Sequence, residues 1–283
     1  MIDLHMHTVF SDGSVRPEDL VQLALDNKLE AIAITDHDTT QSLAYAQKAV
    51  EGHDLEIIPG IEINTVWKEK EVHILGYYIN PEDTTLQEVI QAHRDSRVVQ
   101  MQEMAQKLRS KARLNICFED IVGQASDNGT IGRPHIAKAI VEKGGASTIS
   151  QAFSKFLNPK ADTYVRRKTV PPHEAVEAIY ESGGIAVIAH PGDMEIVEEL
   201  AEDLMNYGLR GLEAYHRSHS PALIEFHCTL AEKLGLIVTG GTDFHGAVEA
   251  YSKALERLHM PPAVYLELHA ERKRLQMSAF KAS

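Results

Sequence analysis

Short apolar runs alternate with helical patterns along most of the chain, and this alternation limits the possible folds more than any other feature. In the first half, apolar runs at 29–35 and 55–67 follow helical patterns at 17–28 and 41–50. The alternation resumes from residue 173 to residue 245. Such an order is typical of α/β proteins with a parallel sheet. At 283 residues, the chain is long enough for one (β/α) barrel with an insertion.

A long helical pattern interrupts this alternation. From about residue 85 to residue 114 apolar residues recur at helical spacings, and the stretch up to about residue 159 shows little strand propensity. We therefore expect a helical insertion at 99–157, which forms a cap. The barrel would consist of residues 1–98 and 158–283.

Composition excludes several classes of protein. No apolar stretch approaches the roughly 18 residues that span a bilayer, and from the first residues, MIDLHMHT, we expect no export signal. Cys117 and Cys228 stand far apart, which suits a reducing compartment. The net charge of -13 repels long polyanions, so binding of extended duplex nucleic acid is not expected. We predict a cytoplasmic protein with no membrane association.

Histidines and carboxylates gather where the apolar runs end. The nine candidate metal ligands are His5, His7, Asp12, His37, Glu62, His73, His190, Asp243 and His245. In a parallel barrel the C-terminal ends of all strands lie on one face, so we expect these side chains to meet there. Imidazole and carboxylate ligands without thiolates suit Mn, Fe or Zn.

Nine ligands are more than one ion accepts, which predicts a cluster of two or three ions with Glu62 as a bridge. A single histidine at a strand end is more often structural. Charged groups that converge without a cation would repel one another, however, and so many together indicate a metal site. Paired ions can activate water and hold the oxygens of a phosphoryl group. We therefore expect phosphoester hydrolysis.

The motifs DLHMHTVFSDG, TDHD, GIEI, EVHILGY, AHP and GTDFH, in this order, resemble the PHP (polymerase and histidinol phosphatase) family of the amidohydrolase superfamily. The resemblance implies a distorted (β/α)7 TIM-like barrel and a metal-dependent phosphomonoesterase with up to three divalent ions. Mn²⁺ is the ion we expect, with Fe or Zn as alternatives. The resemblance gives one ion to His5, His7, Glu62 and Asp243, a second to Glu62, His73 and His190, and a third to Asp12, His37 and His245.

The motif GRPHIA at 132–137 and the helical insertion are similar to one branch of that family. Members of this branch hydrolyse the 3'-phosphate of nucleoside 3',5'-bisphosphates such as pAp, and related ones trim short RNA from the 5' end. We expect a 3',5'-nucleoside bisphosphate phosphatase acting on a small nucleotide. The alternatives are a 5'-3' exoribonuclease on short RNA oligonucleotides, a phosphatase of the histidinol-phosphate type, and a metal-binding PHP module without catalysis.

Substrate contacts are expected from the cap and from one strand end. Arg133 and His135 begin a helical pattern, and an arginine can bind phosphate with two donors. Tyr215 could stack on the substrate or donate to it, although a packed tyrosine is equally consistent with the sequence. The residues expected to act in catalysis are His190, His245 and Asp243, with one of the two histidines protonating the leaving oxygen.

Two further expectations concern charged residues near these motifs. Asp36 and Asp38 flank His37, and we expect their carboxylates to orient that imidazole or a solvent molecule. The VRRK run at 165–168 is predicted to be a solvated cluster.

Overall fold

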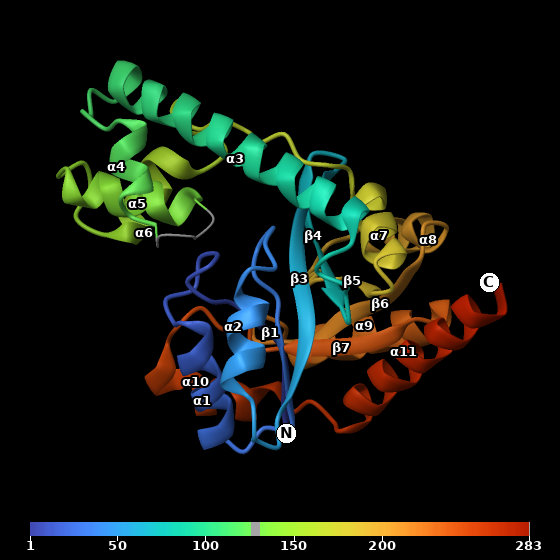
Figure 1. Cartoon of the computed structure of the whole chain (residues 1–283). Coiled ribbons are helices and arrows are strands. Elements are labelled where there is room, and N and C mark those ends of the chain that lie inside the picture. The colour runs from blue at the N-terminus through green and yellow to red at the C-terminus, as the bar shows by residue number, and fades with distance from the viewer. Residues whose placement is uncertain (126–130, 283) are drawn as a thin grey trace.

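The computed structural model describes residues 1–125 and 131–282 (Figure 1). Seven strands form one sheet in chain order: β1 (Ile2–Met6), β2 (Ala31–Ile34), β3 (Glu56–Trp67), β4 (Lys70–Tyr77), β5 (Ile185–Ile188), β6 (Leu209–His216) and β7 (Ile237–Gly241). The described helices are α1 (Pro17–Asp26), α2 (Ser42–Ala49), α3 (Thr84–Lys111), α4 (Phe118–Val122), α5 (Arg133–Glu142), α6 (Ile149–Ala152), the π-helix η1 (Phe153–Leu157), α7 (Pro172–Glu181), α8 (Val197–Met205), α9 (Pro221–Leu234), α10 (Val248–Leu258) and α11 (Ala263–Ala282). In this part of the chain, no helix combines the length and the apolar character needed to cross a membrane.

Strand β4 runs antiparallel to both of its neighbours, whereas the other adjacent strands pair in parallel. Only Lys68 and Glu69 separate β3 from β4, and so short a connection can join only antiparallel strands. The expectation that each ligand follows the C-terminal end of a parallel strand is therefore wrong for Glu62 and His73. These two residues lie within β3 and β4.

The sheet curls into a nearly closed barrel because the segment after β7 returns to β1. Met6 and Phe244 form an isolated parallel bridge, and the His7 N–H donates to the Phe244 carbonyl oxygen at 2.9 Å. The buried Asp3 carboxylate accepts hydrogen bonds from the Thr242 N–H at 2.9 Å and from its hydroxyl at 2.6 Å. The predicted distorted TIM-like barrel is thus confirmed, with a mixed sheet.

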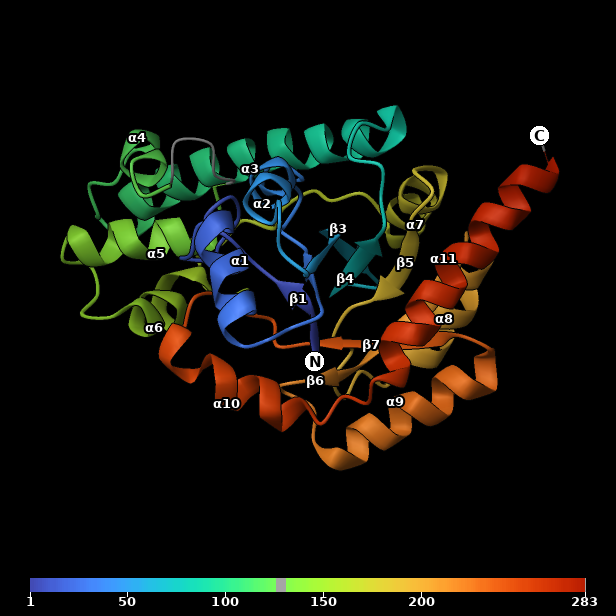
Figure 2. The same cartoon turned by 60° about the horizontal axis from the view of Figure 1, so that its bottom comes forward.

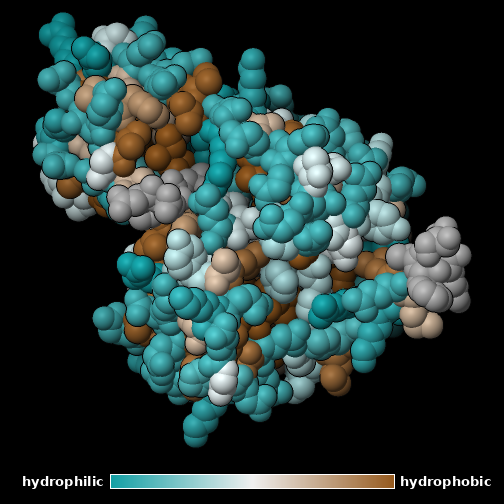
Figure 3. Space-filling view, viewed as in Figure 1, coloured by the Kyte–Doolittle hydropathy of each residue, from teal (hydrophilic) through white to brown (hydrophobic). Residues whose placement is uncertain are grey.

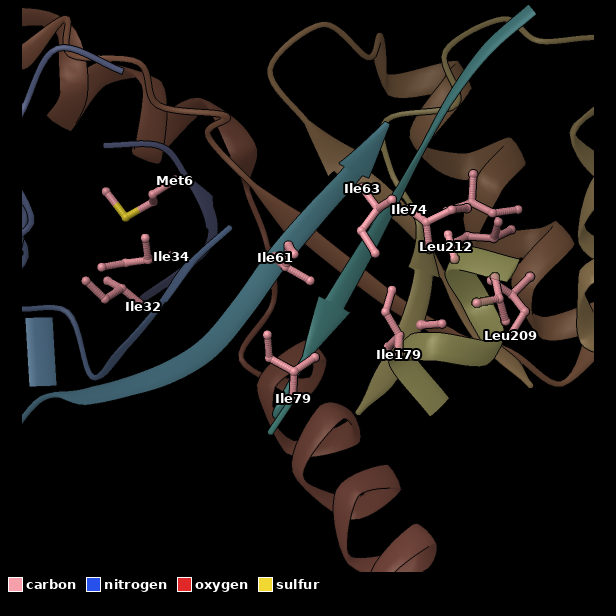
Figure 4. Packing of buried hydrophobic residues seen from close by; sticks show 14 of the residues in the cluster. Met6, Ile32, Ile34, Ile61, Ile63, Ile74, Ile79, Ile179, Leu209 and Leu212 are labelled. Atoms are coloured by element: carbon pink, nitrogen blue, oxygen red, sulfur yellow. The ribbon is translucent and has the colours of Figure 1, made fainter. Parts of the chain in front are cut away.

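Helices surround the strands and share an apolar core with them (Figure 2). Residues two apart on a strand share a face, and Ile32 and Ile34 of β2 and Ile61 and Ile63 of β3 are fully buried in this way. Figure 4 shows these side chains and Ile179 of α7, which belongs to the same cluster. Burying an isoleucine stabilises the fold by about 1.5–3 kcal/mol, so such pairs define which face of each strand meets the helices.

The helix α11 covers one end of the barrel. Its buried Val264 and Leu268 join a second apolar cluster that contains Ile2, Ala31 and Ile185. These three residues begin β1, β2 and β5. The candidate ligands of these strands lie at or just beyond their opposite ends, so α11 closes the barrel on the side away from them.

The cap has an apolar cluster of its own. Met104 and Leu108 in the second half of α3 are buried there with Ile136 and Ile140 of α5. Residues 126–130 of the expected 99–157 cap lie outside the described residues. On the face seen in Figure 3 the surface is mostly hydrophilic, and apolar residues gather in the cap at the upper left.

The helix α3 joins the cap to the barrel. It begins at Asp83, whose carboxylate accepts a hydrogen bond from the Leu86 N–H at 3.0 Å. Leu86 and Ile90 pack into the main core, whereas the second half of the helix packs into the cap. The predicted boundary between residues 98 and 99 falls inside this helix. The cap is therefore carried by a continuous helix that extends beyond the barrel (Figure 1).

Candidate metal centre

Six histidines and three carboxylates from distant parts of the chain converge at one end of the barrel. Their potential ligand atoms fall into four overlapping groups, within each of which the atoms lie no more than 4.8 Å apart. The groups are His7, Asp12, His37 and His245; His5, His7 and Asp243; His5, Glu62 and His190; and His37, Glu62 and His73. The structure thus brings all nine predicted ligands together.

Glu62 lies at the centre of this cluster, and its side chain is almost fully buried. One oxygen, Oε1, lies 2.7 Å from His73 Nδ1 and 3.0 Å from His190 Nε2. The other, Oε2, lies 3.2 Å from the Nε2 atoms of both His5 and His7. The two oxygens therefore face different sets of ligands, which is what a carboxylate bridging two ions requires.

Asp12 organises a third group of ligand atoms. Its Oδ1 lies 3.2 Å from His245 Nε2, and its Oδ2 lies 3.8 Å from His37 Nε2. The loop that carries Asp12 is held by Asp36, whose Oδ1 accepts a hydrogen bond from the Ser11 hydroxyl at 2.5 Å. The carboxylate of Asp36 thus fixes the loop after β1, and the prediction that it orients His37 is corrected accordingly.

Three site residues have a left-handed backbone that residues other than glycine rarely adopt. Their φ angles are 52° at Asp38, 24° at His190 and 50° at Asp243. Such conformations cost about 1–3 kcal/mol each and persist where surrounding contacts hold them. Close packing of β7 on β1 depends on Gly241, because a Cβ atom there would lie 2.4 Å from the His5 Cβ. The site is therefore shaped by strained backbone at three residues and by a glycine where two strands approach closely.

Glu213 is a buried carboxylate that supports two of the histidines. Its Oε1 lies 2.9 Å from His5 Nδ1, and its Oε2 accepts a hydrogen bond from the His190 N–H at 2.7 Å. A carboxylate beside Nδ1 of a histidine keeps the ring proton on Nδ1, so Nε2 is free to bind a metal ion. The sequence places Glu213 near a strand end, but it does not indicate this contact across 208 positions.

The surroundings favour the ionised form of all three carboxylates in the cluster. Burial alone would raise the pKa of Glu62, but His37 and His5 outweigh this effect and hold the pKa well below its usual range. The pKa of Asp12 is likewise lowered, because His37 and its neighbours outweigh burial. The pKa of Asp243 is lowered for the same kind of reason. The site therefore places charged carboxylates beside imidazole nitrogens.

This donor set fits divalent metal ions. His5 Nε2 and His7 Nε2 lie only 3.1 Å apart. With the His5 Nδ1 proton directed to Glu213, its Nε2 lone pair points at His7 and at the Glu62 carboxylate. Such lone pairs repel one another unless a cation or a proton lies between them. Nitrogen and oxygen ligands without thiolates suit Mn, Fe or Zn.

Asp38 ties this site to α3 and to the 165–168 segment. Its fully buried carboxylate accepts hydrogen bonds from Arg97 Nε at 3.1 Å and from Arg167 Nη1 at 2.9 Å. Burial would raise the pKa of Asp38, but these two arginines hold it well below its usual range. Asn64 Nδ2 lies 3.1 Å from Asp38 Oδ2 and 3.2 Å from His37 Nδ1. The carboxylate of Asp38 is thus linked to His37 through Asn64.

Sequence reasoning missed both arginines. Arg167 belongs to the 165–168 run, and the prediction that this run is solvated is wrong for Arg167, whose side chain is only 11% exposed. Arg97 stands in the long helical pattern as one charged residue among many, with nothing local to distinguish it. What distinguishes these two arginines is their shared partner, Asp38, which lies 59 positions from Arg97 and 129 positions from Arg167 in the chain.

A cavity of about 690 Å³ opens beside His73, between the β3–β4 hairpin and the cap. Arg133 lines this cavity, with Nη2 3.5 Å from Glu71 Oε2. His135 is buried, and its Nδ1 accepts a hydrogen bond from the Gly132 N–H at 3.0 Å. The ring of His135 thus closes the first turn of α5, from which Arg133 reaches the cavity.

Tyr215 packs against the apolar cluster that contains Val264 and Leu268 of α11, and its contact with a substrate stays a prediction. Its hydroxyl interacts with the Cys228 thiol of α9. A β-bulge between Glu213 and Tyr215 shifts the register of β6 against β7, and a bulge redirects the side chains that follow it. His216 faces the site instead, with Nε2 3.5 Å from Asp243 Oδ2.

Comparison with known proteins gives consistent matches. A family model described as "PHP domain" matches residues 3–160. A 3',5'-nucleoside bisphosphate phosphatase of Chromobacterium violaceum is 30% identical over 276 residues, covering 95% of this chain and 96% of that protein. The 5'-3' exoribonuclease Rnm of Escherichia coli is 33% identical over 249 residues, covering 86% of this chain and 84% of that protein.

A solved structure from Bifidobacterium adolescentis, described as that of a metal-dependent phosphoesterase, has the same fold. It superposes with a TM-score of 0.81 at 32% identity and covers 91% of this chain and 94% of its own. The similarity therefore extends over the barrel and the cap together.

Proposed function

The chain belongs to the PHP domain family and is a metal-dependent phosphoesterase, and on that premise we propose that it removes the 3'-phosphate from nucleoside 3',5'-bisphosphates. The reaction would convert pAp to AMP and phosphate. The observation that carries the proposal is that His73, a member of the ligand cluster, also lines a cavity of about 690 Å³ with four arginines. This volume is typical of a site for one small molecule, and arginines suit phosphates. Similarity to the C. violaceum phosphatase supports the same substrate.

We propose that the nine clustered residues hold two or three divalent ions, with Mn²⁺ expected. Glu62 would offer one oxygen to each of two ions. Bound ions of this kind supply an activated water and neutralise the phosphoryl oxygens. Glu213 and Asp36 hold the ligands and the loop after β1 in place, so little reorganisation is needed during the reaction.

Residues 99–157 serve in this proposal as a cap that brings Arg133 over the cavity. A guanidinium can bind a phosphate through two parallel hydrogen bonds. His135 supports Arg133 indirectly, because its bond to the Gly132 N–H fixes the start of α5. The cap therefore contributes binding, whereas the barrel contributes the ligands.

His190 and His245 are the proposed donors of a proton to the leaving oxygen, beside Asp243 as the third catalytic residue. Their side chains are 24% and 31% exposed, more than those of the other clustered histidines. A group that meets the leaving oxygen has to be accessible, and the fully buried His5 and His7 are not.

Exoribonuclease activity on short RNA is the second candidate, and the similarity to Rnm of E. coli favours it. The two functions are separated by measuring phosphate release from pAp and mononucleotide release from a 5'-phosphorylated pentanucleotide with equal amounts of Mn²⁺-loaded enzyme. We expect kcat/KM to be at least tenfold higher for pAp. A strong preference for the oligonucleotide would overturn the assignment. The Asp243→Asn variant, purified in parallel, reports any contaminating activity.

The partners expected are thus a small nucleotide or a short oligonucleotide. The net charge of -13 disfavours long nucleic acids. The cytoplasmic location stays a prediction.

A further inference from the structure

The segment 190–192 leaves the sheet after β5 with a backbone that needs support from other elements. The φ angles of His190 and Gly192 are 24° and 58°, both in the left-handed range. Pro191 between them has no backbone N–H and donates no hydrogen bond to the turn. The position of the His190 imidazole, whose Nε2 lies 3.0 Å from Glu62 Oε1, therefore depends on groups outside the segment.

Two buried histidines hold both polar backbone groups of Gly192. The Gly192 N–H donates to His219 Nε2 at 3.1 Å, and the Gly192 carbonyl oxygen accepts a hydrogen bond from His227 Nε2 at 2.8 Å. His219 lies in the loop after β6, and His227 lies on α9. A glycine whose N–H and carbonyl are both bound to buried side chains has little freedom to turn, although glycine is the most flexible residue.

The partners of the two rings define where each ring carries its proton. His219 Nδ1 lies 2.8 Å from the Ala214 carbonyl oxygen, which can only accept, so Nδ1 is protonated and Nε2 offers a lone pair to Gly192. His227 has the opposite tautomer, since its Nε2 donates to a carbonyl oxygen. Burial lowers the pKa of both imidazoles, which favours these neutral forms. One ring thus acts as the acceptor and the other as the donor.

The N–H of His190 is held by the same part of the chain. It donates to Glu213 Oε2 at 2.7 Å, and Glu213 belongs to β6. The segment 190–192 is therefore attached at three points to β6, the loop after it and α9. Glu213 also contacts His5, so its substitution does not isolate the effect of the segment. His219 and His227 are better probes, because their hydrogen bonds to the segment involve Gly192 alone.

We propose that His219 and His227 are positioning residues, which through Gly192 hold His190 where its imidazole binds a metal ion beside Glu62. Neither is among the described residues that line the cavity beside His73, so they act on the ion rather than on the substrate. The inference rests on one part of the proposed function, that the clustered residues bind divalent ions, and not on the choice of substrate. A ligand that is displaced slightly loses most of its contribution, so the two rings determine how tightly one ion is bound.

The test measures Mn²⁺ affinity by titration of metal-free protein. His219→Leu should lower the affinity for one ion at least tenfold, because leucine cannot accept the hydrogen bond from the Gly192 N–H. His219→Gln should stay within about threefold of the wild type, because its amide oxygen can replace Nε2 as the acceptor. His227→Leu and His227→Gln should differ in the same way, since the glutamine amide can donate to the Gly192 carbonyl. Equal affinities in the leucine and glutamine variants would overturn the proposal.

A double variant shows whether the effect passes through His190. His190→Ala removes the ligand itself, so adding His219→Leu to it should lower the Mn²⁺ affinity no further. If His219→Leu causes the same loss with and without His190, then His219 acts through other contacts and the positioning role is wrong.

Leu230→Ala is the matched control for stability. Leu230 lies on α9, as His227 does, and is buried in the main core. Its truncation should lower the urea midpoint of unfolding at least as much as His227→Leu, while the Mn²⁺ affinity of the folded protein stays at the wild-type value. A tenfold loss of affinity in Leu230→Ala would show that loosening of α9 alone explains the effect, against the proposal.

Hydrolysis of pAp separates this inference from the proposed function. If the wild-type protein binds Mn²⁺ but releases no phosphate from pAp, the phosphatase assignment fails, and the affinities of the variants still decide the role of the two histidines. If pAp is hydrolysed, His219→Leu should lower kcat at least tenfold and change KM by less than about threefold, because the cavity lining is unchanged. A raised KM with an unchanged kcat would place His219 in substrate binding and contradict its action through His190.

Discussion

Glu213 Oε1 lies 2.9 Å from His5 Nδ1, although 208 positions separate the two residues in the chain. Both side chains are fully buried. The contact joins β6 to β1 across the site and determines which nitrogen of His5 faces the other ligands. The carboxylate therefore acts on the metal centre through the imidazole that it orients.

Glu213→Gln should weaken metal binding by about 10- to 100-fold, the usual effect of losing a carboxylate that orients a ligating histidine. Gln lacks the charge that holds the proton on His5 Nδ1. Titration with Mn²⁺ measures this change. Glu225→Gln, an exposed substitution on α9, is the control. Equal affinity in the two variants would mean that His5 needs no such partner.

Asp243→Asn should lower both metal content and phosphate release, the latter by at least 100-fold. Its Oδ1 lies 3.6 Å from His5 Nε2 and 3.3 Å from His7 Nε2, and an amide at this position removes one negative charge from the ligand set. Elemental analysis and a phosphate assay are the measurements. Chelation of the wild-type enzyme should abolish release, and added Mn²⁺ should restore it. An Asp243→Asn protein with full metal content and full activity would contradict the metal assignment.

Asp38→Asn should destabilise the fold by about 3–5 kcal/mol, because it leaves the guanidiniums of Arg97 and Arg167 together without a counter-charge in a buried setting. Urea unfolding gives the free energy of unfolding. Asp54→Asn, at an exposed position, should change it by less than about 0.5 kcal/mol. A similar small change in both variants would show that the pairing of Asp38 with Arg97 and Arg167 contributes little to stability.

His93 should make stability depend on pH between about 6.5 and 4. Burial lowers its folded pKa to about 4, with Asp38, Arg97 and Arg167 as its charged neighbours. As the pH falls below 6.5, the unfolded chain takes up a proton that the folded state refuses, so stability is lost progressively down to about pH 4. His93→Gln should remove up to about 3 kcal/mol of this loss. Urea unfolding of metal-free protein at pH 7.5 and pH 4.5 tests it; parallel losses in both proteins would refute the shift.

Leu268→Ala should cost about 2–5 kcal/mol, because Leu268 is fully buried where α11 covers the barrel end. Leu266→Ala on the same helix is the control, since its side chain is 66% exposed and should cost far less. Thermal or urea unfolding measures both. Equal losses would show that helix propensity rather than packing accounts for the effect.

The ligand cluster could be predicted from the sequence because its members are chemically distinctive and stand at or near apolar runs. The direction of β4 could also have been predicted, since only two residues separate it from β3. A mixed sheet lets His73, within the antiparallel β4, meet ligands that follow parallel strands, so His73 does not need to stand at a strand end.

Other features have no local signal. Arg97 and Arg167 are largely buried where they pair with Asp38, and this pairing arises only once the fold brings α3 and the 165–168 segment together beside β2. Tyr215 would share a face with Glu213 in a regular strand, but a bulge intervenes. A bulge depends on how a strand packs against its neighbours, so the residues of β6 alone do not predict it.

The bridge between Met6 and Phe244 has a consequence for synthesis of the protein. Strand β1 is synthesised early, but Phe244, which pairs with Met6 at its edge, is synthesised more than two hundred residues later. Asp243 and His245 also emerge late, so a nascent chain cannot assemble the complete ion-binding set. The complete ion-binding set therefore exists only after residue 245 has been synthesised, and until then this edge of β1 is open to pairing with other strands.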